Sequence, residues 1–201
     1  MRRLARSPAR DDPDAALLAA YAAGDDAAAR VLIGRLGPRL LALATRMLGD
    51  GAEAEDIAQE AMLRLWQRAA EWRPGEARVA TWVTRVALNL ATDRLRRRRG
   101  TGLDEAFGPG REPPDERPGA EAGLRAAERA RALRAALAEL PERQAQAVAL
   151  RHLQGLSNPE IADVMGLGVE AVESLTARGK RALAARLDGR RDALTLEDGD
   201  E

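Results

Sequence analysis

The 201-residue chain lacks cysteine and has few aromatic residues. Without cysteine it has no disulfide, thiolate metal site or cysteine nucleophile, and it fits a reducing cytosol. With so few aromatics, its cores must be built from leucine, alanine, valine and isoleucine. The first residues, MRRLARSPARDDPD, are basic but precede no apolar segment, so they do not resemble a signal peptide. No run approaches the ~18 apolar residues of a membrane span. We therefore expect a cytoplasmic protein with no membrane span.

Motifs of enzymes are also missing. His152 is the one histidine, and no partner with metal-ligand spacing accompanies it. No glycine-rich phosphate loop or nucleophile motif is present. We therefore predict no catalytic residue, no metal site and no cofactor, and an enzyme is the least favoured class.

Charge is present in quantity but segregated along the chain. The 32 basic and 32 acidic residues cancel to a formal net charge of zero. Residues 81–100 nevertheless carry six arginines against Asp93 alone, whereas residues 101–121 and 188–201 each carry six acids against two arginines. Such segregation hints at a surface for a polyanion, with acidic segments elsewhere.

Apolar residues recur at spacings of three and four, and the alternation typical of strands is missing, so an all-α protein is expected. Glycine and proline mark the ends of the helices. The helical signals cover residues 13–48, with breaks near Gly24-Asp25 and Gly37-Pro38, then 53–72, 77–99, 121–140, 141–155 and 155–187.

Residues 100–123 are rich in glycine, proline and acids, a composition that predicts a flexible linker. The expected organisation is two small helical domains joined by this linker. Its parts are a disordered N-terminus at 1–14, a first domain at 15–99, the linker at 100–123, a second domain at 124–187 and an acidic tail at 188–201 that we expect to be frayed.

The most specific local signal is a helix-turn-helix in GLSNPEIADVMGLGVEAVESLTARGKRALAARL, residues 155–187. Ser157 followed by Glu160 predicts a capping box. Gly166-Leu167-Gly168 is a tight turn, after which Val169, Val172 and Leu175 predict the inner stripe of a second helix. That layout places the second helix in a DNA major groove. A helical hairpin with a solvated charged face is the plainer alternative.

The segment 77–99 has an apolar line at Val79, Val83, Val86 and Leu90. Roughly opposite lie Arg85, Asn89, Asp93 and Arg96-Arg97. An amide and a carboxylate among arginines could trap an unpaired base while the cations hold the backbone. The alternative is a solvated helix end whose cations suit the helix dipole. The five arginines there, Arg94 and Arg96 to Arg99, exceed that need.

The segment AEAEDIAQEAMLRLWQRA, residues 52–69, has a stripe of Ile57, Ala61 and Leu65. Another side carries Asp56, Gln59, Glu60, Leu63 and Gln67. An apolar residue among polar ones indicates a protein-contact surface. An equally favoured alternative is that Asp56 and Glu60 are ordinary acids that suit the helix dipole in the N-terminal half of a helix.

With these three helices in order, the chain resembles the extracytoplasmic-function sigma factors of bacterial RNA polymerase. AEDIAQEAMLRLWQ is similar to the helix that docks on the clamp helices of the largest polymerase subunit. ARVATWVTRVALNLATDRLRRRR is similar to the helices that melt and capture the minus-ten element. LPERQAQAVALRHLQGLSNPEIADVMGLGVEAVESLTARGKRAL is similar to the domain that reads the minus-thirty-five element.

The resemblance implies three sets of contact residues. Polymerase would be bound by Asp56, Gln59, Glu60 and Leu63. Minus-ten DNA would be bound by Arg85, Asn89, Asp93, Arg94, Arg96 and Arg97. Minus-thirty-five DNA would be bound by Ser174, Arg178, Lys180 and Arg181. Glu173 and Leu175 depart from the family, which commonly has basic residues there, so upstream recognition stays open.

The implied partners are core RNA polymerase, through its clamp helices and the flap of the second-largest subunit, promoter DNA and an anti-sigma factor. The implied role is transcription initiation in a stress response. Two alternatives stay open. One is a sigma-like mimic that sequesters an anti-sigma protein, and the other is a plain helix-turn-helix regulator.

Overall fold

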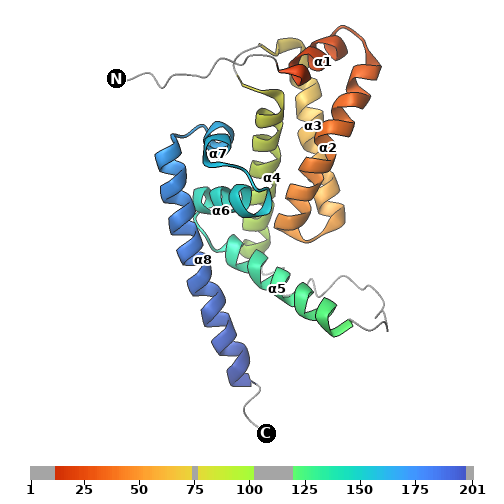
Figure 1. Cartoon of the computed structure of the whole chain (residues 1–201). Coiled ribbons are helices and arrows are strands. Elements are labelled where there is room, and N and C mark those ends of the chain that lie inside the picture. Colours follow the sequence, from red (N-terminus) through yellow and green to blue (C-terminus); the bar gives the residue numbers. More distant parts are fainter. Residues whose placement is uncertain (1–11, 74–76, 102–119, 198–201) are drawn as a thin grey trace.

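The computed structural model describes residues 12–73, 77–101 and 120–197, which include all the elements below (Figure 1). The N-terminal domain comprises α1 (Pro13–Ala22), α2 (Asp26–Leu48), α3 (Gly51–Arg68), a short 3-10 helix η1 (Ala69–Glu71) and α4 (Val79–Thr101). The expected 1–14 extension therefore overlaps the start of α1. Within the described residues no strand occurs, as the periodicity predicts.

Aspartates begin the first three helices because a carboxylate satisfies backbone N–H groups that a helix start leaves unpaired. Asp12 accepts from Asp14 N, Asp25 from Ala27 N and Ala28 N, and Asp50 from Glu53 N. Gly49 ends α2 in the left-handed conformation, at a φ of 67°, which only glycine adopts without strain. The expected break at Gly24-Asp25 and the expected end of the segment 13–48 are therefore confirmed.

The expected break at Gly37-Pro38 is wrong, because α2 continues through Pro38. Proline lacks the N–H that would bond to the carbonyl of Gly34, and its ring crowds that carbonyl. Gly34 is exposed, so water can reach the carbonyl. On the opposite side Leu32, Leu36 and Leu40 are all buried, and their packing outweighs the local cost.

The C-terminal domain comprises α5 (Ala120–Ala138), α6 (Glu142–Val148), a π-helical turn η2 (Ala149–Leu153), α7 (Asn158–Met165) and α8 (Val169–Glu197). The predicted frayed end begins too early, since α8 runs past Leu187 to Glu197. Residues 188–197 contain no proline, and most are good helix formers. The greater part of the predicted linker lies outside the described residues.

The two domains lie against one another, with α4 between them (Figure 1). One apolar cluster includes Leu40 and Leu65 of the N-terminal domain and Leu150, Ile161 and Val172 of the C-terminal domain. A smaller cluster, around Leu137 and Val148, lies within the C-terminal domain alone. Helix α4 therefore has one face toward α2 and α3 and another toward α6 and α7.

Candidate polymerase and nucleic-acid interfaces

One face of α3 is an exposed polar surface with an apolar centre. The predicted stripe of Ile57, Ala61 and Leu65 is buried, which confirms which side of α3 faces the core. Leu63 lies on the other side and is 49% exposed. The side chains around it are Asp56, Gln59, Glu60 and Gln67, of which Glu60 is half-buried and the others exposed. The structure thus brings together the four residues predicted to bind polymerase.

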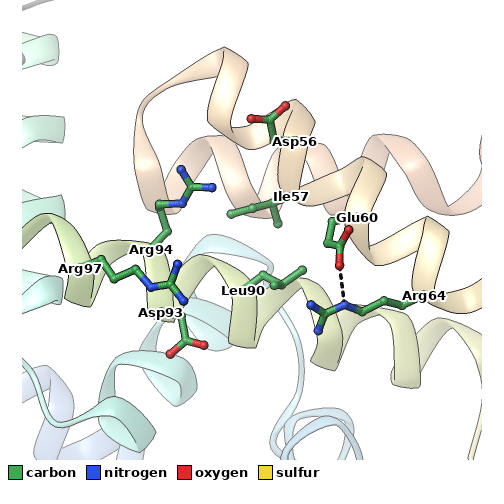
Figure 2. Close-up of a pocket in the computed structure, with 8 residues that line it drawn as sticks. All are labelled: Asp56, Ile57, Glu60, Arg64, Leu90, Asp93, Arg94 and Arg97. Carbon is green, nitrogen blue, oxygen red and sulfur yellow. Dashed lines mark hydrogen bonds and ion pairs between the residues drawn. The ribbon is translucent and has the colours of Figure 1, made fainter.

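Beside this face, an open groove of about 410 Å³ separates α3 from α4 (Figure 2). Its charged lining consists of three acids and three arginines, so the formal charges cancel. From α3 it takes Asp56, Ile57, Glu60 and Arg64, and from α4 Leu90, Asp93, Arg94 and Arg97. Arg64 Nε donates to Glu60 Oε1 at 2.8 Å, so Arg64 partly neutralises a predicted polymerase contact. Arg64 is not among the residues predicted from the sequence to bind polymerase.

The buried stripe of α4 differs from the predicted line in its second half. Val79 and Val83 are fully buried, but Val86 and Leu90 are only half-buried. The stripe continues instead through Ala87, Ala91 and Leu95. The predicted line mixes spacings of three and four residues, which average close to the 3.6 residues of a helical turn and so stay on one side of the helix. The buried residues are instead spaced by four throughout, so the buried stripe turns gradually around α4.

The arginines near the C-terminal end of α4 have several different tasks. Arg98 is largely structural: its side chain is 12% exposed, bonds to Glu53 at 2.7 Å and donates to the carbonyl of Leu48 at 3.0 Å. Arg94 lies 3.5 Å from the same Glu53 carboxylate. These two arginines tie the end of α4 to the turn between α2 and α3. Only part of the cationic block is therefore available to a ligand.

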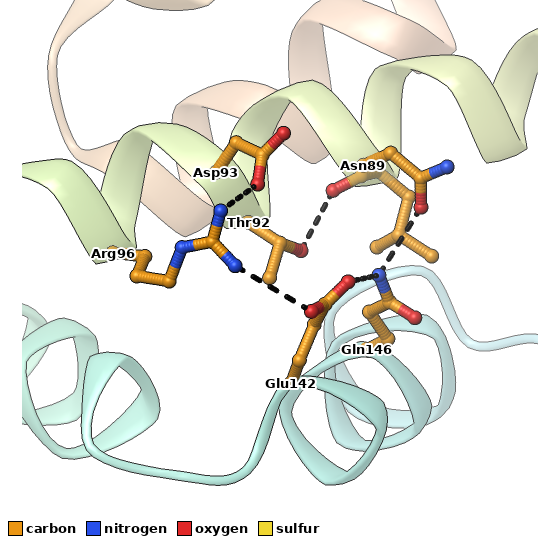
Figure 3. Close-up of polar contacts among 7 residues, drawn as sticks. Asn89, Thr92, Asp93, Arg96, Glu142 and Gln146 are labelled. Carbon is orange, nitrogen blue, oxygen red and sulfur yellow. Dashed lines mark hydrogen bonds and ion pairs between the residues drawn. The ribbon is translucent and has the colours of Figure 1, made fainter.

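The remaining polar face of α4 contacts the C-terminal domain (Figure 3). The amide oxygen of Asn89 accepts from Gln146 Nε2 at 3.1 Å. Arg96 pairs with Asp93 at 2.9 Å and lies 3.8 Å from Glu142. Arg85 donates to the carbonyls of Val164 and, at 2.7 Å, Asp163. The structure thus gathers Arg85, Asn89, Asp93 and Arg96 on one face.

Sequence reasoning missed the partners that the C-terminal domain supplies to α4, Glu142 and Gln146. Gln146 is 7% exposed, and its place between two alanines, Ala145 and Ala147, was the available signal.

Trp82 packs edge-on against Trp72 at 5.9 Å between ring centroids, and Arg68 lies 5.8 Å above it. Both tryptophans are partly buried and pack against the common core.

The helix-turn-helix is formed by α7 and α8. Glu160 accepts from the backbone N–H of Ser157 at 2.8 Å and from its hydroxyl at 2.6 Å, which confirms the capping box. These bonds stabilise the carboxylate and lower the pKa of Glu160 below its ordinary value. Val172 is fully buried, whereas Val169 is 39% exposed and does not join the inner stripe as predicted.

The outward face of α8 is open. Ser174, Arg178, Lys180 and Arg181 are all exposed, as a surface for duplex DNA requires. Arg178 Nε donates to the carbonyl of Ser174 at 3.2 Å, which holds its guanidinium along the helix. Glu173 accepts from Asn158 Nδ2 at 3.3 Å, so this departure from the family pattern links α8 to α7.

Among the described residues, none of the helices is long and apolar enough to cross a bilayer. The same part of the chain contains no group of histidine and acidic side chains that could hold a metal ion. Lone His152 is exposed.

A helical bundle with an arginine-rich helix, packed beside a helix-turn-helix domain, is the architecture of a DNA-binding transcription protein. Two family models match the chain: sigma-70 region 2 over residues 32–101 and sigma-70 region 4 over residues 130–183. The chain belongs to the extracytoplasmic-function sigma factors, which are DNA-binding initiation factors of RNA polymerase and not enzymes themselves.

Curated relatives match most of the chain. The RNA polymerase sigma-H factor of Pseudomonas aeruginosa is 30% identical over 178 residues, covering 80% of this chain and 86% of that protein. The ECF RNA polymerase sigma factor SigM of Mycobacterium tuberculosis is 34% identical over 177 residues, covering 87% of this chain and 84% of that protein.

Solved structures are similar across both domains. CnrH in complex with the cytosolic domain of CnrY has a TM-score of 0.61 and 27% identity, and the match covers 89% of this chain and 99% of that one. The sigma factor RpoE in complex with the anti-sigma factor NepR from Bartonella quintana has a TM-score of 0.51 and 18% identity, covering 79% and 96%. The second likeness is one of fold alone.

Proposed function

We propose that this chain brings core RNA polymerase to promoters, opens the DNA at the minus-ten element and reads the minus-thirty-five element. The observation that carries the proposal is the placement of three separate surfaces on one chain. They are the Leu63-centred face of α3, the polar face of α4 and the basic face of α8. A regulator that only bound duplex DNA would need the third surface alone.

The α3 face fits a protein partner. An exposed leucine ringed by acidic and amide side chains has the apolar centre and polar rim of an interface. We assign Asp56, Gln59, Glu60 and Leu63 to the clamp helices of the largest polymerase subunit. The flap of the second-largest subunit would bind the C-terminal domain, and the proposed site of action is the cytoplasm, where polymerase works.

The α4 face fits an unpaired strand. Arg85, Arg96 and Arg97 can hold phosphates, and Asn89 and Asp93 have hydrogen-bonding groups for an exposed base edge. Arg94 and Arg97 line the groove between α3 and α4, whereas Arg85 and Arg96 lie on the side of α4 toward the C-terminal domain. A strand that crosses the end of α4 would therefore meet cations on both sides of the helix. No covalent chemistry is required of these residues.

The α8 face fits a duplex. Arg178, Lys180 and Arg181 are exposed late in the helix, where they can reach phosphates on either side of a major groove, and Ser174 can reach a base edge or phosphate. Glu173 is held by Asn158, so it is directed partly toward α7 and its effect on phosphate binding is reduced.

We further propose an anti-sigma protein as the regulator of this chain. Support comes from CnrH, which is solved in complex with the cytosolic domain of CnrY and matches this chain over both domains. The chain has no cysteine with which to sense oxidants directly, so a thiol-redox stimulus would have to act on another protein.

The decisive experiment is run-off transcription with core RNA polymerase on a fragment library of the source genome. Wild-type chain is compared with an Asn89→Ala, Arg96→Ala double variant. Discrete start sites that the variant loses would support promoter opening by α4. Binding to core without transcripts would favour a sigma-like mimic, and no binding to core would overturn the proposal.

A further inference from the structure

Helix α8 is held by other helices along one of its sides. Figure 1 shows it passing first α7, then α6 and then α5. Three residues on this side are seven positions apart, namely Val172, Gly179 and Arg186. Because seven residues make about two full turns of an α-helix, these three lie nearly in line along α8. We call the side that carries them the mounting face.

Each residue of the mounting face contacts a different neighbour. Val172 is fully buried in the apolar cluster that includes Ile161 of α7. Gly179 is buried against α6. Arg186 donates through Nε to Glu139 Oε2 at 3.0 Å and through Nη2 to the Glu139 carbonyl at 3.3 Å, just beyond the end of α5. The path of α8 is therefore set by contacts within the C-terminal domain.

At Gly179 the helices α8 and α6 cross closely. A Cβ atom at this position would lie 2.6 Å from Val148 Cγ2 and 3.1 Å from the carbonyl oxygen of Gln144. Carbon atoms in contact are normally ~3.5–4.0 Å apart, so any other residue would require one of the helices to move. Glycine is otherwise unfavourable inside a helix, where alanine is the better helix former. The close crossing is therefore what requires glycine here.

The residues proposed to contact the upstream duplex surround this crossing. Arg178 and Lys180 are the sequence neighbours of Gly179, and Ser174 and Arg181 lie within two helical turns of it. A hydrogen bond to a base edge needs its two atoms ~2.7–3.2 Å apart, so it tolerates little displacement. The attraction of a cation to the phosphate backbone changes more gradually with distance and carries no sequence information. A small shift of α8 would therefore affect base contacts first.

We propose that Gly179 is a positioning residue that determines the sequence specificity of α8. The inference rests on the minus-thirty-five role proposed above for this helix. Because it lets α8 cross α6 closely, Gly179 sets the tilt at which the exposed side of α8 approaches the bases. Gly179 is buried and has no side chain, so it acts only through the residues that it positions. A residue that widens the crossing would lower the affinity for a preferred sequence and leave the affinity for arbitrary DNA unchanged.

The test uses the full chain with Gly179→Ala, and Gly34→Ala on α2 is the matched control. Both replace a helix glycine by alanine, but nothing lies within 4 Å of the Cβ that Gly34 would gain. The rescue variant combines Gly179→Ala with Val148→Ala, which removes the Cγ2 atom that the new methyl group would meet. Val148→Ala alone shows the effect of the smaller side chain by itself.

Selection from a random-sequence duplex library by the wild-type chain supplies a preferred duplex, and a scrambled duplex of the same composition is the comparison. Anisotropy titrations at one salt concentration measure both affinities. We expect Gly179→Ala to bind the preferred duplex about tenfold more weakly, the effect of losing about one good base contact. Its affinity for the scrambled duplex should be unchanged, since no charge is altered. The rescue variant should regain a large part of the loss, and Gly34→Ala should match wild type.

Circular dichroism establishes that each variant folds. If Gly179→Ala fails to fold, Arg186→Gln takes its place, because it removes the bonds that hold the other end of the mounting face to Glu139. The lost charge weakens binding to both duplexes alike, so the ratio of the two affinities isolates the positioning effect. That ratio should fall about threefold, and an unchanged ratio would overturn the inference.

A folded Gly179→Ala variant that keeps the wild-type ratio would also overturn the inference, as would an equal loss for both duplexes. So would a folded rescue variant that regains nothing, or a wild-type chain that selects no preferred duplex. None of these measurements contains polymerase. A failure here is therefore distinguishable from a failure of run-off transcription, which bears on the proposed function.

Discussion

The task of a side chain in this protein depends more on its exposure than on its residue type. Leu63 and Leu65 are two residues apart on α3, yet one is 49% exposed and the other fully buried. Arg98 and Arg96 are equally close, yet the first ties helices together and the second is exposed. Identical chemistry thus performs different tasks on different sides of one helix.

Replacing Leu63 with asparagine should weaken binding to core polymerase about tenfold, because an apolar group at the centre of an interface contributes more than its rim. The free energy of unfolding should change by less than about 0.5 kcal/mol, since the site is exposed. Ile33→Asn is the matched control, at 50% exposure on α2. Fluorescence titration with core polymerase measures the effect, and equal affinities for the two variants would contradict it.

The capping box should make stability depend on pH through Glu160. Its folded pKa is lowered by the bonds from Ser157, so its contribution is present above the unfolded pKa, near 4.3, and is lost as the pH falls through the folded value. Glu160→Gln should be less stable than wild type by about 0.3–1 kcal/mol near neutrality. Urea unfolding at several pH values should show this gap closing in acid, and a constant gap would contradict the assignment.

At the scale of elements, helices here tolerate local faults when one side is firmly packed. Helix α2 passes through Pro38 because the buried leucines on its other side hold the path. Helix α8 continues past its expected end for a different reason, since residues 188–197 contain no proline and most are good helix formers. In α2, therefore, the local breaking signal is weaker than the burial around it.

Pro38→Ala should stabilise the protein by about 1–2 kcal/mol. Alanine restores the N–H for the Gly34 carbonyl and removes the ring clash, worth about 3 kcal/mol in a regular helix, less the relaxation already present in α2. The greater freedom of the unfolded chain offsets about 0.4–1 kcal/mol of this. Thermal and urea unfolding measure the change. An unchanged or lower stability would mean that a bend at Pro38 is required for packing.

At the scale of the whole molecule, a net charge of zero results from separate basic and acidic regions that cancel. The basic surfaces are α4 and α8, and the sequence cancels them with acids elsewhere. The described structure exposes the basic face of α8 while the polar face of α4 contacts α6 and α7. A neutral chain of this kind meets DNA through local patches, so its binding should still depend strongly on salt.

Replacing Lys180 and Arg181 with glutamine should flatten the salt dependence of duplex binding. Each lost phosphate contact lowers the slope of log K against log salt by about one, so the double variant should lose about two. Arg30→Gln with Arg39→Gln, exposed on α2, removes the same charge away from α8 and should leave the slope unchanged. Anisotropy titrations on an upstream promoter duplex measure both, and equal slopes would place the duplex elsewhere.

Much of this protein was determined by its sequence alone, because the signals are local. Helix periodicity, the aspartate caps, the glycine turn at residue 49 and the Ser157–Glu160 box each depend on residues within one or two turns of one another. The same locality let the buried stripe of α3 and its Leu63 face be predicted. The resemblance then supplied roles that no local pattern contains.

Tertiary structure decided what residues do across long sequence distances. Arg98 became structural only because Glu53 and Leu48 lie beside it, and Asn89 meets Gln146 from the other domain. Pro38 stayed within a helix because leucines from one face found a common core. Periodicity reports which side of a helix is apolar, but not which distant group will cover its polar side, and that covering is what holds α4 in this structure.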